Sequence, residues 1–324
     1  MAEGHHEETS AVMRVACVGI LVADVMASPV GGYPGKGVLE RVDAVTMHNG
    51  GNAMTAAINL RKMGVESYMV GKVGDDMFGD FLRKKLDLAG VDTRALTTDR
   101  ETQTSVSVVL LDASGERSFL HCVGTNGTFG IADIDFDVIG ECDLVFVTGS
   151  FLMDRFDGEE TRDFLKKCKE MGKTTFLDVC WDAKDRWGAL LDMSMPYIDY
   201  LMPSIDEAVR IAGCDDPDAI ADVFTEKGAK NVVIKMGKTG AFLRLSGESR
   251  GKIYPAVGKV KAVDTTGAGD SFCSGFLAAF ARGNTPEECA RFANAVGALC
   301  VTAKGATTGI RTYDETLEFL KENS

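Results

Sequence analysis

Short apolar runs alternate with helical patterns along most of this chain of 324 residues. Each run is bounded by turn residues, which is typical of strands buried on both faces of a parallel sheet. The runs lie at residues 15–19, 143–148, 174–178, 198–202 and 231–235. Between them, apolar residues recur at helical spacing over 53–63, 78–89 and 161–171, and a glycine follows each stretch. The alternation predicts βαβ units and an α/β fold with a mostly parallel sheet.

Two segments break this alternation. Residues 38–48 and 104–123 show period-two patterning, and the second contains a turn at 112–116. We expect antiparallel strands that form a small separate sheet over about 36–49 and 103–124. Such an inserted sheet serves as a lid or an interface, although a plain peripheral decoration is the alternative.

Composition limits the class of protein. The hydrophobic fraction of 45% and charged fraction of 26% are ordinary for a globular chain. No apolar run approaches the roughly 18 residues of a membrane span.

The acidic start, MAEGHHEETS, has no signal-peptide pattern, so we expect a loose leader over 1–12 and a single domain over 13–320. A net charge of -13 disfavours nucleic acid and anionic membranes as partners.

The nine cysteines contain no C-x-x-C pair and are scattered through the expected strands and helices. This usage favours buried thiols over disulfides or zinc, and it suits the reducing cytoplasm.

One stretch near the C-terminus, VDTTGAGDSFCSGFL at 263–277, combines a turn with a helix start. Phe272, Phe276 and Phe280 recur every four residues, which predicts a buried helix from near Asp270 to Gly283. Gly267, Ala268 and Gly269 then present backbone N–H groups at the positive end of this helix. Asp270 is the first side chain beyond them, and an ordinary N-cap is the alternative reading of that residue.

Two common nucleotide motifs do not fit. The Walker spacing fails because Lys167 and Val232 occupy the position of the first glycine, and the dinucleotide fingerprint fails at Phe272. Phosphoryl transfer to a hydroxyl requires both an anion cradle and a carboxylate that takes the hydroxyl proton. The stretch offers both groups.

Residues 263–277 closely resemble the C-terminal motif of the PfkB, or ribokinase-like, family of carbohydrate kinases. The resemblance runs roughly from residue 14 to 310 and includes the segments 50–64, 70–79 and 291–306. It implies a ribokinase-like three-layer αβα sandwich with a β-sheet lid, and an ATP-dependent, Mg²⁺-requiring kinase that phosphorylates a hydroxyl of a small sugar. In relatives such lids often pair across a homodimer, so we expect one here.

The resemblance also implies roles for individual residues. Asp270 would be the catalytic base, and the amides of Gly267, Ala268 and Gly269 would stabilise the transferring phosphoryl group. The acceptor would be held by Asp24, whose carboxylate accepts hydrogen bonds from two sugar hydroxyls. Gly50, Gly51 and Asn52 would form the second side of the sugar site.

On the donor side the resemblance implies Glu207, Gly237, Thr265 and Asn294, with Glu207 linked to Mg²⁺ through water. Lys235 occupies a donor-side position where relatives often carry a small hydroxyl residue, so the resemblance gives it no definite role. A monovalent cation, expected to be K⁺, would lie among Asp264, Thr266, Ala303 and Gly305, although an ordinary structural loop is the alternative for Ala303 and Gly305.

The sequence departs from the family pattern at three further positions. Ser204 replaces an asparagine near Glu207, which leaves the detail of Mg²⁺ handling open. Thr55 and Val22 replace polar residues of the sugar side, and these two changes disfavour ribokinase itself. A nucleoside kinase of the same superfamily and a catalytically silent sensor remain alternatives. We assign His48 and His121, on the expected lid strands, no role beyond structure or exposure.

Overall fold

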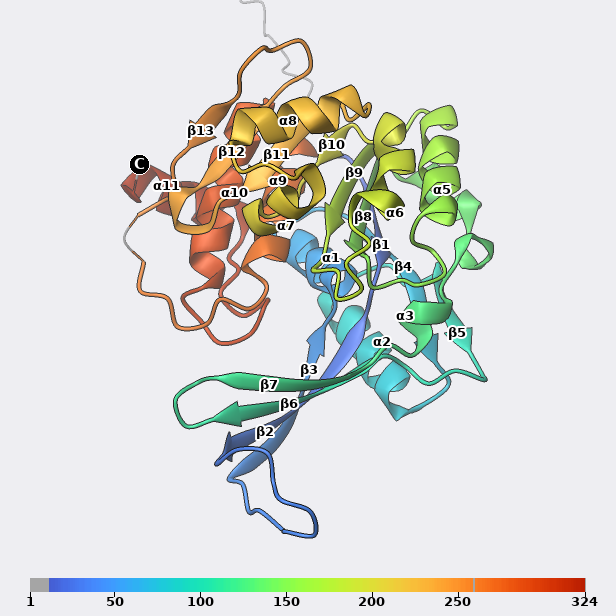
Figure 1. Cartoon of the computed structure of the whole chain (residues 1–324), viewed down its shortest axis with the longest axis vertical. Helices are drawn as coiled ribbons and strands as arrows, with labels where there is room; N and C mark the ends of the chain where they lie inside the picture. Colours follow the sequence, from blue (N-terminus) through green and yellow to red (C-terminus); the bar gives the residue numbers. More distant parts are fainter. Residues whose placement is uncertain (1–11, 259, 324) are drawn as a thin grey trace, which may run out of the picture.

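The computed structural model describes residues 12–258 and 260–323. Its strands form two sheets in this part of the chain, and helices cover both faces of the larger one (Figure 1). The expected leader at 1–12 lies outside the described residues except for Val12.

The larger sheet has nine strands. In spatial order they are β13 (Lys252–Tyr254), β12 (Ala241–Arg244), β11 (Asn231–Lys235), β10 (Tyr200–Leu201), β9 (Thr174–Val179), β8 (Leu144–Ser150), β1 (Val15–Gly19), β4 (Ser67–Gly74) and β5 (Leu96–Asp99). The seven strands from β11 to β5 pair in parallel, and β12 and β13 are antiparallel at one edge. The expected mostly parallel sheet is therefore confirmed.

Side-chain alternation in β1 shows why helices cover both faces. Val15 and Cys17 belong to one buried core, and Ala16 and Val18 belong to another. Because successive side chains of a strand point to opposite faces, each face needs its own apolar cover. The result is a three-layer αβα sandwich.

The helices divide between these two layers. The first core is covered by α1 (Asn52–Lys62), α2 (Met77–Ala89), α9 (Ala268–Phe280), α10 (Pro286–Cys300) and α11 (Tyr313–Asn323). The second core is covered by α4 (Phe136–Glu141), α5 (Glu159–Glu170), α6 (Gly188–Leu191), α7 (Ile205–Ala212) and α8 (Pro217–Glu226). The shorter elements are α3 (Thr125–Thr128), η1 (Ile131–Asp133), η2 (Asp192–Tyr197) and η3 (Gly237–Thr239).

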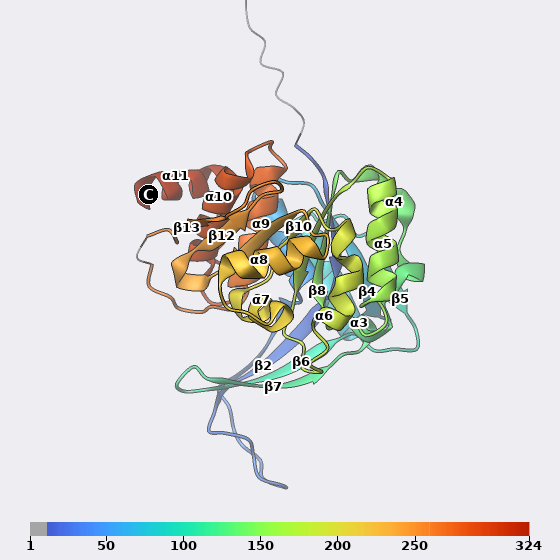
Figure 2. The same cartoon turned by 45° about the horizontal axis from the view of Figure 1, so that its top comes forward.

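The smaller sheet, here called the lid, projects from the body of the molecule (Figures 1 and 2). Its strand order is β3 (Ala44–Gly50), β2 (Val22–Val30), β6 (Val106–Asp112) and β7 (Arg117–Cys122).

The lid differs from the prediction in three ways. The strand expected over 38–48 begins only at Ala44, and β2 was not predicted at all. Most of β2 is half-buried along its length, so no apolar alternation marks it. The expectation of purely antiparallel pairing is wrong for β2 and β6, which run parallel.

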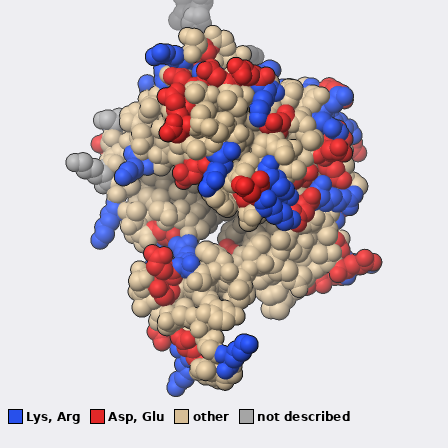
Figure 3. Space-filling view, viewed as in Figure 1, with Lys and Arg blue, Asp and Glu red and all other residues tan. Residues whose placement is uncertain are grey.

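The parallel strands place their carboxyl ends at the edge of the large sheet that faces the lid (Figure 1). β4 and β5 lie on one side of β1, and β8 to β11 lie on the other. In open α/β sheets, ligands bind at such a reversal of strand order, outside the carboxyl ends. The space-filling surface is hollowed where the lid meets the body (Figure 3).

Candidate active site

A polar row crosses the lid. His48, Asp24, Ser107 and His121 occupy one register on its four neighbouring strands. Residues directly opposite each other in a sheet point to the same face, so the four side chains share one face. Ser107 Oγ and His121 Nδ1 are hydrogen-bonded at 3.1 Å. Burial raises the pKa of Asp24, while Ser107 and His48 oppose that change.

Two glycines let the lid approach the body closely at the base of this row. A Cβ on Gly50 would lie 2.2 Å from Oδ2 of Asp24. Gly51 has φ of 87°, and a Cβ there would lie 2.5 Å from the carbonyl oxygen of Ile20. Only glycine fits both the space and the positive φ at position 51. The pair therefore delivers the chain into α1 directly beside Asp24.

Asn52, the first residue of α1, connects this region with α9. Its Nδ2 donates a hydrogen bond of 2.7 Å to Oδ1 of Asp270, and its Oδ1 accepts one from Cys180 Sγ at 3.2 Å. Asp270 remains partly accessible to solvent. Burial of its carboxyl, together with the Glu207 carboxylate, outweighs the opposing Lys235 charge and raises the pKa of Asp270 to about 6.

The turn before α9 contains the glycines of the predicted anion cradle. Gly267 is the N-cap residue with φ of 74°, and a Cβ there would lie 2.3 Å from Cβ of Ala306. The helix therefore begins at Ala268, slightly before the predicted start, and Asp270 lies in its first turn. The alternative reading of Asp270 as N-cap is wrong. The amides of this first turn have no partner within the helix and lie at its positive end.

A buried ion pair lies beside this turn. Lys235, at the end of β11, places Nζ 2.6 Å from Oδ1 of Asp178, and their side chains are 12% and 2% exposed. Burial lowers the pKa of Lys235, but the Asp178 carboxylate more than reverses this, so the lysine stays protonated. A Cβ on Gly269 would lie 3.6 Å from the same Nζ. The ammonium therefore faces the cradle.

Burial is the main cause of the raised pKa of both Asp178 and Asp270, and the nearby Glu207 carboxylate adds to the shift of each. Glu207 therefore belongs to the same charged cluster. Its Oε2 accepts a 2.8 Å hydrogen bond from the backbone N–H of Ser204, which forms a capping box at the start of α7. Asp178, Asp270, Glu207 and Lys235 thus form one charged cluster beside the turn before α9. Among the described residues, no cluster of His, Cys, Asp and Glu side chains has the arrangement of a metal site.

The expected K⁺ site holds a lid side chain. Asp264 Oδ1 accepts hydrogen bonds from Arg117 Nη2 and from the backbone N–H of Thr266, and Asp264 Oδ2 accepts one from the N–H of Gly305 at 2.9 Å. Arg117 Nη1 also contacts Thr266 Oγ1. Burial raises the pKa of Asp264, but these hydrogen bonds more than offset that effect and hold the pKa well below its usual range. Ala303 forms only a long backbone bond, to Cys300 at 3.4 Å.

The remaining donor-side residues lie around β11 and α10. Gly237 is exposed with φ of 55° and has open space on its Cβ side. Asn294 is buried, and its Nδ2 donates to the carbonyl oxygens of Tyr254 and Pro255 at 2.9 and 3.0 Å. Its amide therefore holds the segment after β13. Thr265 is exposed, and its carbonyl accepts from Ala268 at 3.2 Å.

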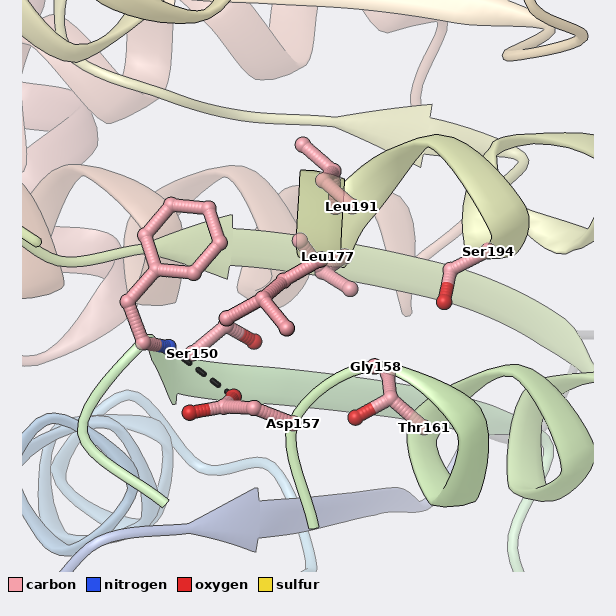
Figure 4. Close-up of a pocket in the computed structure, with 9 residues that line it drawn as sticks. Ser150, Asp157, Gly158, Thr161, Leu177, Leu191 and Ser194 are labelled. Atoms are coloured by element: carbon pink, nitrogen blue, oxygen red, sulfur yellow. Dashed lines mark hydrogen bonds between the residues drawn. The ribbon is translucent and has the colours of Figure 1, made fainter. Parts of the chain in front are cut away.

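A separate small cavity lies between β8, β9 and α5 (Figure 4). It is lined by Ser150, Asp157 and Ser194, among others, and its volume of about 10 Å³ is near that of one water molecule. No sugar or nucleotide fits there, so the cavity is not the candidate site.

The pfkB family carbohydrate kinase model matches residues 13–312 of the chain. The chain is a member of the PfkB family. The resemblance found in the sequence is therefore confirmed, and the molecule is a carbohydrate kinase by family.

Curated relatives agree with this assignment to the PfkB family. Aminoimidazole riboside kinase of Salmonella typhimurium is 29% identical over 285 residues, which cover 85% of this chain and 88% of that protein. Fructokinase of Klebsiella pneumoniae is 30% identical over 278 residues, covering 82% and 90%.

A solved structure of Arabidopsis thaliana ribokinase complexed with ribose and ATP is similar to this PfkB chain, with a TM-score of 0.84 and 25% identity. The similarity covers 96% of this chain and 99% of that one. It confirms the expected ribokinase-like fold.

The PfkB fold brings most of the predicted residues together. Around Asp270 lie Asn52, Gly267–Gly269, Glu207 and Lys235. The lid brings Asp24 next to Gly50, two residues before Asn52. Sequence patterns did not single out Ser107, Arg117 or Asp178 as site residues. Strand alternation on β7 places Arg117 and His121 on one face, but only the cross-strand register links that face to Asp24.

Proposed function

We propose that this protein transfers the γ-phosphoryl group of ATP to a hydroxyl of a small sugar or sugar-like acceptor. The observation that carries the proposal is the Asn52–Asp270 contact, which connects the acceptor side to the phosphate cradle. ATP as the donor is supported by the similar ribokinase structure, which contains ribose and ATP.

In the proposed reaction, Asp24 and Asn52 orient the acceptor and Asp270 takes the proton of its hydroxyl. A pKa of about 6 leaves Asp270 mostly ionised at neutral pH while keeping it a useful base. The amides of Gly267, Ala268 and Gly269 stabilise charge on the transferring group, and the Lys235 ammonium adds to that stabilisation. Closing the lid over the hollow would exclude water, which otherwise competes as acceptor.

For the donor, we propose that Glu207 holds Mg²⁺ through water and that Gly237, Thr265 and Asn294 border the nucleotide. The carboxylates around the cradle fit Mg²⁺, which prefers one or two carboxylates plus substrate phosphates. When bound, the ion neutralises charge on the phosphates. Lys235 and Glu207 are neighbours, because Lys235 N–H donates to Pro203 O beside the capping box.

The polar row across the lid suggests how the acceptor is recognised. A carboxylate accepts two hydrogen bonds from a vicinal diol, and Asp24 lies between His48 and Ser107 at one register. This arrangement supports a polyhydroxylated acceptor, either a free sugar or the ribose of a riboside.

Three coarser expectations complete the proposal. Residues 13–320 act as one domain, since both cores share the nine-stranded sheet. The nine cysteines are all free, which supports a cytoplasmic location. In the described part of the chain, no helix is long and apolar enough to cross a membrane.

We further propose that two copies pair through the lid face opposite Asp24. Val45, Val108 and Leu120 share that face and are 66%, 37% and 53% exposed. Exposed apolar surface of this kind favours association. Sedimentation of the wild type and of Leu120→Lys measures it: a dimer that Leu120→Lys splits supports the interface, and a wild-type monomer contradicts it.

The central experiment is ADP release measured against a panel of free sugars, sugar acids and nucleosides. We expect at least one acceptor to give ATP-dependent turnover that requires Mg²⁺. Preference for free sugars over adenosine would separate a sugar kinase from a nucleoside kinase. Binding without turnover across the whole panel would instead support a silent sensor.

A further inference from the structure

The contact between Arg117 and Asp264 joins the lid to the phosphate cradle. Arg117 is the first residue of β7, and Asp264 lies three residues before Gly267. Their side chains are 27% and 11% exposed. The two residues are 147 positions apart, so only the folded position of the lid brings the guanidinium to this carboxylate.

This geometry conflicts with the expected K⁺ site. A cation at Asp264 needs free oxygen lone pairs, but Asp264 Oδ1 already accepts from Arg117 and from Thr266 N–H. Asp264 Oδ2 accepts from Gly305 N–H, and the hydroxyl of Thr266 contacts Arg117. A second positive charge beside the guanidinium would also be repelled. With Arg117 in place, both lone pairs of Asp264 Oδ1 and one of Oδ2 are used. Despite the carbonyls of Ala303 and Gly305, this occupied and positively charged pocket fits a monovalent cation poorly.

We propose that the guanidinium of Arg117, on lid strand β7, takes the place of a monovalent cation at Asp264. In that position it holds the cradle turn in the conformation that receives phosphate. The inference rests on the proposed role of Gly267–Gly269. Arg117 acts through Asp264 and Thr266, so it is a positioning residue and not a catalytic one.

The path from the guanidinium to the cradle is short. Thr266 directly precedes Gly267, and its N–H and hydroxyl are held by Asp264 and Arg117. On the other side, Gly267 packs against Ala306, and Asp264 also holds Gly305. Through these hydrogen bonds, Asp264 connects the two chain segments that shape the cradle. In the observed position of the lid, the Arg117 guanidinium balances the negative charge of Asp264 at that junction.

The test compares wild type, Arg117→Met, Arg117→Lys and a control in buffers whose only monovalent cation is tetramethylammonium or potassium at equal ionic strength. The control is Arg250→Met, the same substitution at an exposed arginine between β12 and β13. We expect the Tm of wild type and control to be the same in both salts. For Arg117→Met, potassium binding at the vacated carboxylate should raise Tm by about 2–4 °C.

Turnover with an acceptor from the panel gives the second readout. Wild type should change less than twofold between the salts, whereas Arg117→Met should lose on the order of tenfold or more in tetramethylammonium, as misplaced anion-hole donors do. Potassium or added guanidinium should restore most of the loss. Arg117→Lys should keep part of the wild-type turnover without potassium.

Several results would overturn the proposal. One is a wild-type enzyme that potassium activates severalfold, and another is an Arg117→Met enzyme indifferent to both potassium and guanidinium. A third is a loss in Arg117→Met confined to the KM of acidic acceptors, which would assign Arg117 to acceptor binding. If Arg117→Met does not fold, the proposal is tested by comparing Tm and turnover of wild type and Arg117→Lys in the two salts. The Tm series needs no turnover, so it remains decisive even if the proposed kinase activity fails.

Discussion

Asn52 Nδ2 donates a hydrogen bond of 2.7 Å to Oδ1 of Asp270, across 218 positions of the chain. Asn52 begins α1 directly after the two glycines beside Asp24, and Asp270 lies in the first turn of α9. The two helices therefore point their N-terminal ends at the same place. In the proposed reaction, an acceptor bound beside Asn52 would have its hydroxyl near both Asp270 and the Gly267–Gly269 turn.

Replacing Asp270 with asparagine should abolish turnover but preserve binding. Asparagine keeps the size of the side chain but cannot take a proton, so we expect kcat to fall about 10³-fold. Steady-state kinetics and calorimetric titration with ADP measure the two effects. Asp137→Asn, an exposed carboxylate on α4, is the control. Turnover near the wild-type rate in Asp270→Asn would remove Asp270 from the base role.

Replacing Asp24 with alanine should chiefly weaken acceptor binding. Hydrogen bonds to a charged group contribute about 1.5–3 kcal/mol, so the KM for the acceptor should rise about 10- to 100-fold while the KM for ATP stays constant. Asp43→Ala, an exposed carboxylate in the β2–β3 loop, is the matched control. An unchanged acceptor KM would place Asp24 outside the site.

The acid limb of the pH profile should report Asp270. Because burial raises its pKa to about 6 and the ionised form is the active one, kcat/KM should fall as the pH drops through about 6. The profile is measured with the best acceptor from the panel. Residual activity of Asp270→Asn should lack this limb, and a wild-type midpoint near the ordinary value of about 4 would contradict the assignment.

A double substitution separates the structural and functional roles of Lys235. Lys235→Met alone leaves Asp178 buried without its partner, which should lower the free energy of unfolding by about 3–5 kcal/mol. Adding Asp178→Asn should restore most of that stability. The KM for ATP should stay raised in both variants, because the ammonium beside the cradle is missing. Full recovery of ATP affinity in the double variant would make Lys235 purely structural.

Much of the fold was predictable because periodicity is local. The strand at 231–235 was predicted with the bounds of β11, and the helix over 53–63 closely matches α1. The lid strand β2 escaped prediction, since it is half-buried over most of its length and shows no alternation. Its parallel partner β6 lies far along the chain, and no local pattern encodes that pairing.

The candidate site divides in the same way. The stretch around Gly267–Asp270 could be recognised from the sequence, because a Gly-rich turn, a carboxylate and the start of a helix are neighbours in the chain. Ser107, His48 and His121 carry no such mark, and two histidines that the sequence assigned no role now flank the Asp24–Ser107 pair.

The sequence by itself determined the parts whose residues are contiguous: the alternating α/β layers, the cradle and the family motif. The tertiary structure alone decided which polar and charged side chains meet. It paired Lys235 with Asp178, Asn52 with Asp270 and Arg117 with Asp264, each across dozens to hundreds of residues. The physical reason is that turns and helices follow from neighbouring residues, whereas contacts between distant side chains depend on strand order and register, which the closed fold sets.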